Sequence, residues 1–194
     1  LIYRQETSDS DVNKAQLNIT YFDGLGRPIQ QVIGKMSNSG KDIITHIAYD
    51  GFGRQTKEYL PYASTTANLN YDSGASTNVF NYYLDATKVQ ETTSYPYSEK
   101  FFEPSPLDRV RKQAAPGEAW KGNTGNDNDN TIKFAYVTNS ESDGIIMLRA
   151  QAGPNVNSST LSYDISLIND NQTYPTNQLY KNVVQDENKA SALL

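Results

Sequence analysis

The sequence predicts an all-β fold, built mainly from antiparallel hairpins with few short helices, in a sandwich-like or partial β-shell arrangement. Three observations support this expectation. The 194 residues include 14 Tyr and 6 Phe, which pack well on half-exposed strands. Long runs of strong helix formers are missing, whereas Asn, Ser, Thr and Asp are abundant. A glycine-rich turn motif also occurs twice between segments of alternating polarity.

The repeated motif has the order aromatic, Asp, Gly, apolar, Gly, Arg. Asp can bond its own backbone at a tight turn, and Gly tolerates the positive φ that such turns require. We expect each arginine to pair with a turn aspartate or to lie on aromatic rings of the neighbouring hairpin. The predicted structural turn residues are Phe22, Asp23, Gly24, Gly26, Arg27, Tyr49, Asp50, Gly51, Gly53, Arg54 and Arg109.

The first third of the chain is expected to form two successive hairpins. Residues 1–14 are a polar lead-in with an edge strand at residues 1–4, and the turn motif separates strands at residues 15–22 and 29–36. Its second copy separates strands at residues 43–50 and 54–60. Since Leu1 is not an initiator Met, the chain is expected to be a mature or excised piece of a longer protein.

The pattern is weaker between residues 61 and 97. Residues 71–74 resemble a degenerate turn, residues 78–84 could form a strand or one helical turn, and residues 86–92 have modest helical potential. A third, diverged unit follows, in which Pro104-Ser105-Pro106 replaces the glycine turn and Arg109 takes the arginine position. The only Trp, Trp120, is expected to anchor a small satellite cluster.

We expect these hairpins to form one region, residues 15–121. Residues 122–130 are rich in Asn and Asp and are predicted to be a flexible loop. Residues 131–188 are predicted to add β-strands packed on the same domain, and residues 189–194 are expected to fray. Within them we expect strands at residues 131–138 and 144–151 joined near residues 139–143, a turn at residues 153–155, and further strands at residues 161–168 and 177–185.

Composition excludes several classes of function. The formal net charge of −5 argues against a nucleic-acid partner, which would require a basic face. No run of 18 apolar residues occurs, so this segment is not expected to insert into a membrane. The lack of Cys removes disulfides, thiolate metal sites and cysteine nucleophiles.

No constellation of residues predicts catalysis. Asp42 and Asp50 lie four residues either side of the single His46, about 13 Å away along a strand, so neither would orient it locally. Asp23 and Asp50 could be imagined as paired acids of a glycosidase, but turn capping explains both. Residues 126–130 offer oxygens to calcium without the spacing of an EF-hand loop. We therefore predict no catalytic residue, no cofactor and no metal site, and a protein that is not an enzyme.

The two Asp-Gly-x-Gly-Arg units resemble those of YD-repeat, or RHS-repeat, proteins, whose repeats are built around Tyr-Asp and Gly-Arg. Ser105-Pro106-Leu107-Asp108-Arg109-Val110 also resembles the N-terminal, pre-repeat region of Bacteroidetes-type RHS proteins. The resemblance implies a secreted or cell-surface protein, a β-shell that in many members encloses a C-terminal toxin, and the remaining repeats of the parent chain as partners. Because residues 61–97 and 122–170 carry no copies, a compact β domain preceding or opening such a shell is expected.

The resulting hypothesis is a non-enzymatic structural or interaction segment of a large exported protein. One alternative is a carbohydrate- or surface-binding β module that uses exposed Tyr or Trp rings on a glycan or protein partner. A less favoured alternative is a glycoside hydrolase, which needs two acids within about 10 Å across a cleft.

Overall fold

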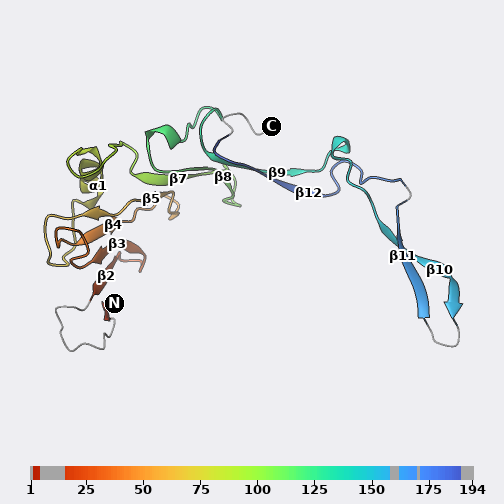
Figure 1. Ribbon diagram of the computed structural model, residues 1–194, viewed down its shortest axis with the longest axis horizontal. Helices are drawn as coiled ribbons and strands as arrows, with labels where there is room; N and C mark the ends of the chain where they lie inside the picture. The colour runs from red at the N-terminus through yellow and green to blue at the C-terminus, as the bar shows by residue number, and fades with distance from the viewer. Residues whose placement is uncertain (1, 5–15, 158–161, 170, 189–194) are drawn as a thin grey trace. The chain divides into compact units, whose positions relative to one another are not determined.

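The computed structural model describes residues 2–4, 16–157, 162–169 and 171–188, and it divides the chain into two compact units (Figure 1). The first unit comprises residues 1–133 and 185–194, and the second comprises residues 134–184. The described residues are all-β apart from one α-helix and two short 3₁₀ turns, which confirms the predicted fold class. Residues 5–14 and 189–194, the expected lead-in and frayed end, lie outside the described residues.

The regular elements of the first unit are β1 (Ile2–Arg4), β2 (Leu17–Phe22), β3 (Pro28–Ile33), β4 (Ile43–His46), β5 (Lys57–Tyr59), β6 (Tyr62–Ala63), α1 (Ala75–Leu84), β7 (Tyr97–Phe102), β8 (Val110–Ala114), η2 (Glu118–Trp120) and the first two residues of β9 (Ile132–Thr138). The second unit holds the rest of β9, η3 (Glu141–Asp143), β10 (Arg149–Asn157), β11 (Ser162–Ile168) and β12 (Tyr180–Gln185) up to residue 184.

The first sheet is antiparallel, with its strands in the order β1–β2–β3–β4–β6. β2 and β3 form the expected first hairpin, in which Ile19 lies opposite Val32. The register shifts between Tyr21 and Phe22, directly before the turn at residues 23–27. Such a bulge adds one residue to a strand and increases the local twist, which allows a turn longer than a two-residue loop.

The second expected hairpin does not form as predicted. β4 pairs with β3 and β6, whereas β5 pairs with β7 in another sheet. Only the isolated bridge between Ile47 and Glu58 joins the two arms across the turn at residues 50–54. The motif therefore carries the chain from one sheet to the next, because pairing with β7 and β6 satisfies the backbone groups that a closed hairpin would have satisfied.

The second sheet of this unit contains β5, β7, β8 and the start of β9, each pair antiparallel. β7 and β8 form a hairpin around the turn at residues 103–109, with a register shift between Phe101 and Phe102. The diverged third copy of the turn motif is thus a hairpin. Its register shift lies next to the turn, as in the hairpin of β2 and β3.

Helix α1 covers the first sheet and closes the core. Ala75 and Val79 of the helix are buried against Val32, Ile44 and Tyr62, all at most 3% exposed. The strand alternative for residues 78–84 is therefore wrong, and the helix is longer than one turn. Its apolar positions lie four residues apart, which places them on one helical face. Residues 86–92 contain no helix.

The second unit contains two strand pairs, β9 with β12 and β10 with β11. The strand expected at residues 144–151 begins only at Arg149, as β10, and β9 takes β12 as its neighbour in the sheet. The turn expected at residues 153–155 is wrong, because these residues lie within β10 at an irregularity of its register. Packing of residues 131–188 on the hairpin region stays a prediction.

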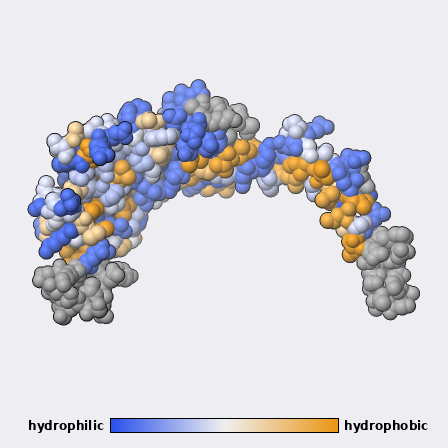
Figure 2. Space-filling model, viewed as in Figure 1, coloured by the Kyte–Doolittle hydropathy of each residue, from blue (hydrophilic) through white to orange (hydrophobic). Residues whose placement is uncertain are grey.

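Burial differs between the two units. Among the residues of the second unit whose side chains the structure describes, only Asn139 is buried, and large apolar side chains such as Ile165 and Leu167 are each 71% exposed. Figure 2 shows hydrophobic residues on the visible face of this unit, whereas hydrophilic residues predominate on that of the first. The first unit therefore holds the hydrophobic core of the described chain.

Candidate functional site

The two Asp-Gly-x-Gly-Arg turns have the same backbone and side-chain hydrogen bonds. In the first turn (residues 23–27), the Asp23 amide donates to the Arg27 carbonyl at 2.9 Å, and Asp23 Oδ1 accepts the amides of Leu25 and Arg27, both at 2.9 Å. In the second turn (residues 50–54), Asp50 makes the equivalent bonds with Phe52 and Arg54 at the same distances. The aspartate thus caps the turn, which is the role that its place before Gly predicts.

The arginine of each of these two turns also pairs with the aspartate of the same turn. Arg27 Nε and Nη2 lie 2.8 Å from Asp23 Oδ2, and Arg54 Nε and Nη2 lie 2.9 Å from Asp50 Oδ2. The guanidinium plane is therefore fixed at the turn by two charge-assisted contacts. Gly26 and Gly53 have φ values of +77° and +80°, which a residue with a Cβ adopts only at a cost.

The third turn (residues 103–109) reaches the same result with different residues. The Glu103 amide donates to the Arg109 carbonyl at 2.9 Å, and Arg109 donates from Nε to Glu103 Oε1 and from Nη2 to Oε2, both at 2.9 Å. Ser105 adds a hydroxyl bond to Glu103 Oε1 at 2.6 Å. Sequence reasoning missed Glu103, although the pair Phe102-Glu103 repeats the aromatic-acid order of Tyr49-Asp50.

The three turns are linked to one another through arginine and aromatic rings. The Cζ atom of Arg27 lies 4.5 Å from the centroid of the Tyr49 ring, and that of Arg54 lies 4.6 Å from the Phe102 ring. Each ring directly precedes the acid of the next turn, and Arg54 also forms an ion pair with Asp108 of the third turn. We call these two contacts the arginine–aromatic ladder, with the rungs Arg27–Tyr49 and Arg54–Phe102.

Strand register explains why these residues meet. The pair Gln30–His46 of β3 and β4, continued by three residues, places Arg27 opposite Tyr49. The pair Lys57–Glu99 of β5 and β7, continued by three residues, places Arg54 opposite Phe102. Directly opposite residues of antiparallel strands have side chains on the same face, about 5 Å apart, so each rung is a cross-strand pair extended into the turn.

The apolar residue in the middle of each turn faces solvent. Leu25, Phe52 and Leu107 are 79%, 85% and 68% exposed, respectively. The Cζ atom of Arg54 lies 5.0 Å from the centroid of the Phe52 ring, on the turn it belongs to. The ladder therefore buries its arginines and carboxylates only in part and presents apolar side chains outward.

The arginines change the acidity of the turn carboxyls. Hydrogen bonds from the Arg27 amide, and then from its side chain, lower the pKa of Asp23, and Arg54 does the same for Asp50. The side-chain hydrogen bonds of Arg109 and Ser105 lower the pKa of Glu103 to about 2. All three acids are therefore ionised at neutral pH, as a carboxylate that holds a guanidinium requires.

The structure does not assemble a site around His46. Its ring lies 5.0 Å from that of Tyr59, and burial lowers its pKa. Buried Asp42 instead accepts the amides of Lys35 and Leu69 at 3.0 and 2.7 Å, and Asp50 is held in its own turn. The only histidine is thus a packed strand residue.

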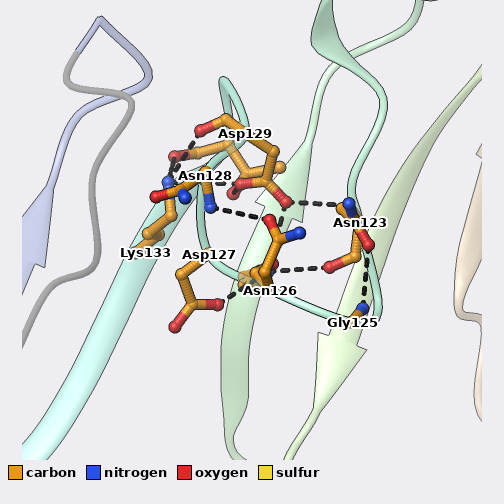
Figure 3. A network of polar contacts seen from close by, with 9 residues as sticks. Asn123, Gly125, Asn126, Asp127, Asn128, Asp129 and Lys133 are labelled. Atoms are coloured by element: carbon orange, nitrogen blue, oxygen red, sulfur yellow. Dashed lines mark hydrogen bonds and ion pairs between the residues drawn. The ribbon is translucent and has the colours of Figure 1, made fainter.

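The Asn/Asp segment forms a cation cage that is filled by a lysine. Lys112 Nζ lies 2.9 Å and 2.6 Å from the carbonyl oxygens of Asn123 and Asn126, and 2.7 Å and 3.1 Å from carboxylate oxygens of Asp127 and Asp129. Figure 3 shows the segment folded around Asp129, with Lys133 beside it. Mobility of residues 122–130 stays a prediction.

Asp129 holds the centre of this cage. Burial raises its pKa, but hydrogen bonds from Thr131, the Asn123 amide, Lys112 and Lys133 outweigh it, so the pKa is about 2. In the part of the chain that the structure describes, no group of three His, Asp or Glu side chains is placed to hold a metal ion. The oxygens that could have attracted calcium face the Lys112 ammonium instead.

A cavity of about 460 Å³ lies beside helix α1 in the first unit. Its lining includes the rings of Tyr62, Tyr71 and Tyr82 and the amides of Asn78 and Asn81. Asp72 in its wall accepts hydrogen bonds from Tyr62 Oη at 2.6 Å and from Asn78 Nδ2 at 2.9 Å. Burial and this bond raise the pKa of Tyr62 far above its usual range. Aromatic and hydrogen-bonding groups together make the cavity a candidate binding site.

Trp120 does not form part of this cavity. It is 37% exposed and lines a separate, mostly apolar cavity of about 410 Å³ with Ala115, Pro116 and Ile132. Among the described residues, no helix is long and apolar enough to cross a membrane.

Comparison with known protein families identifies the family to which the chain belongs. Residues 2–134, more than half of the chain, match the model of a family described as a domain of unknown function (DUF6443). No curated protein and no solved structure matches the chain. The matched range contains all three turns and both rungs of the ladder, and it ends one residue beyond the boundary between the two units. The chain belongs to the DUF6443 family.

Proposed function

We propose that this chain is a non-enzymatic structural segment of a large exported or cell-surface protein of the YD-repeat or RHS-repeat type. In this proposal its turns interlock strand pairs into a continuous β-rich scaffold, and its partners are the remaining repeats of the parent chain. The arginine–aromatic ladder is the observation that supports it. It joins successive turns through equivalent arginine–ring contacts, so the same kind of contact can be repeated along a chain.

The chemistry of the ladder favours scaffolding over catalysis. Asp23, Asp50 and Glu103 each hold a guanidinium, and those of Arg27 and Arg54 also lie over aromatic rings. A carboxylate paired in this way is a poor general acid or base near neutral pH, because its proton affinity is low. The same pairing makes a strong and directional link between elements.

Two measurements test the scaffold proposal. The parent reading frame should contain many further Tyr-Asp and Gly-Arg units and should direct the protein to the cell exterior, which fractionation of the native host with an antibody to this segment would detect. A reading frame that stops near Leu194, or a protein found only in the cytosol, would contradict the proposal.

A second candidate function is binding of a carbohydrate, supported by the cavity beside α1. Tyr71 in its wall is 48% exposed, and the neighbouring amides could bond sugar hydroxyls. Ring pairs in the described chain are tilted or edge-on, from 48° for Tyr62–Tyr82 to 78° for Tyr59–Phe80. This candidate therefore depends on the cavity and not on a flat aromatic platform.

Titration of the ¹⁵N-labelled protein with neutral monosaccharides and disaccharides would test the second candidate. Binding at the cavity should shift the side-chain amide signals of Asn78 and Asn81, and Tyr71→Ala should abolish the effect. Asn38→Ala, an exposed substitution outside the cavity, is the matched control. A panel of sugars that leaves these signals unmoved would remove the candidate.

A further inference from the structure

The first turn has an aromatic residue that the ladder does not use. Phe22 directly precedes Asp23, just as Tyr49 precedes Asp50 and Phe102 precedes Glu103. Tyr49 and Phe102 are partly buried, each under an arginine, whereas Phe22 is 50% exposed. Within the described residues no cation or aromatic ring stacks on Phe22. Phe22 therefore has the same place before its turn as Tyr49 and Phe102, but no described arginine lies over its ring.

The register of the edge strand shows where that arginine would lie. β1 pairs with β2 so that Ile2 faces Ile19. Continued by three residues toward the turn, this pair places Phe22 opposite the position three residues before Ile2. Both existing rungs lie three residues beyond a regular pair, Gln30–His46 and Lys57–Glu99. The strand register at Phe22 therefore matches that of the two existing rungs.

We infer that Phe22 is the docking site for an arginine of a preceding turn of the same kind, carried by the parent chain on the strand that runs into β1. This inference rests on the proposed scaffold function. It names the partner that binds at the Phe22 end of the arginine–aromatic ladder. The arginine occupies the position three residues before Ile2, and it brings its own turn carboxylate.

The chemistry of the site favours a guanidinium held by such a turn. A planar guanidinium stacks on a ring face, as both existing rungs show, whereas an ammonium is more strongly hydrated. The Asp23 carboxylate next to Phe22 already holds Arg27, so it does not recruit the incoming charge. A partner that carries both arginine and acid needs no further counter-ion at Phe22.

An extended protein tests the inference directly. The sequence Tyr-Asp-Gly-Phe-Gly-Arg-Gln is added before Leu1 of the full chain, which places the new arginine three residues before Ile2. A double-mutant cycle combines Arg or Leu at that position with Phe22 or Phe22→Leu, and urea unfolding gives each folding constant. We expect a coupling of about two- to five-fold in the folding constant, the range of an exposed cation–π contact. NMR should show the arginine δ protons shifted upfield only when Phe22 is present.

Two controls separate the inference from the function on which it rests. One extra Gly before Leu1 moves the arginine out of register and should abolish the coupling. The same cycle on Arg27 and Tyr49 measures an existing rung. If Arg27 and Tyr49 couple while the extension does not, the inference fails and the scaffold proposal stands. If neither pair couples, both fail. A parent sequence with an acidic or apolar residue three positions before Ile2 would also overturn the inference.

Discussion

At the residue scale, the ladder depends on properties that only arginine combines. The side chain of Arg54 pairs with Asp50 through two nitrogens, reaches Asp108 with a third, and lies over Phe102. A planar fork can make these contacts at once, whereas a lysine ammonium offers one charged point. Side-chain hydrogen bonds with Asp50 and Asp108 accordingly raise the pKa of Arg54.

Arg54→Lys should therefore destabilise the first unit although the charge is kept. Loss of the stacked, forked geometry should lower the folding constant by about two- to five-fold, measured by urea unfolding followed by tyrosine fluorescence. Arg111→Lys, at an exposed position of β8 outside the ladder, is the control and should change the unfolding midpoint little. Equal effects of the two substitutions would show that Arg54 makes no specific contribution.

Glu103 should make stability depend on pH in the acid range. Its pKa is about 2 in the folded protein against 4.5 for the unperturbed group, so folding favours the ionised form. This contribution is complete above about pH 4.5 and is lost as pH falls toward 2. In Glu103→Gln the unfolding midpoint should fall less steeply between these values, measured by urea unfolding at a series of pH values. Exposed Glu91→Gln is the control, and an unchanged acid limb in Glu103→Gln would contradict the assignment.

At the element scale, a glycine sets the spacing between the first and second turns. A Cβ on Gly53 would lie 3.3 Å from Arg27 Nη1, whereas one on Gly24 would have nothing within 4 Å. The second turn therefore approaches the first turn's arginine so closely that a Cβ at Gly53 would require the Arg27 side chain to move by a few tenths of an ångström.

Gly53→Ala should cost about 1–2 kcal/mol from its left-handed backbone alone, with a further loss if Arg27 is displaced. Gly26→Ala shares the positive φ but has open space, so the difference between the two variants measures the contact with Arg27. Gly24→Ala should be close to neutral. Thermal and urea unfolding of the three variants would check the order, and a larger loss in Gly26→Ala would contradict it.

Buried ion pairs of Asp129 with two lysines stabilise the Asn/Asp segment, residues 122–130. The side chains of Asp129, Lys133 and Lys112 are only 6%, 3% and 11% exposed. Asp129→Asn removes the one carboxylate shared by both ammonium groups and should destabilise the protein by about 3 kcal/mol or more, since it removes the ion-pair partner of the buried Lys133 ammonium. Asp127→Asn, at a more exposed carboxylate, is the matched control. Addition of calcium should not raise the melting temperature, because Lys112 occupies the oxygens; a calcium-dependent rise would contradict this account.

At the scale of the whole molecule, the two units should differ in stability. The first contains the buried cluster of Val32, Ile44, Tyr62, Ala75 and Val79, whereas Asn139 is the only buried residue among those of the second whose side chains are described. Hydrogen exchange should therefore be fast for amides of residues 134–184 and slow for β3 and β4, as expected where few apolar contacts oppose local opening. Equal protection of the two units would contradict this expectation.

Local sequence predicted the turns and much of their chemistry. The Asp-Gly-x-Gly-Arg spacing was enough to expect capping by Asp23 and Asp50 and contact of the arginines with acids and rings. The role of Glu103 was not predicted, because Pro and Ser replace the glycines of the motif after it. Its longer side chain spans the larger turn. The second hairpin was wrong because alternation shows which residues form strands but not which strands pair.

The amino-acid sequence by itself determined the β-rich class, the positions of the three turns and the pairing of each arginine within its turn, because these depend on residues at most six apart. Only the tertiary structure decided that β4 and β5 join different sheets, that Lys112 fills the Asn/Asp segment and that Arg54 meets Phe102. Those contacts join residues far apart in the chain, and they are set by strand register and by the need to pair buried charge. The same register leaves Phe22 exposed at the end of the ladder.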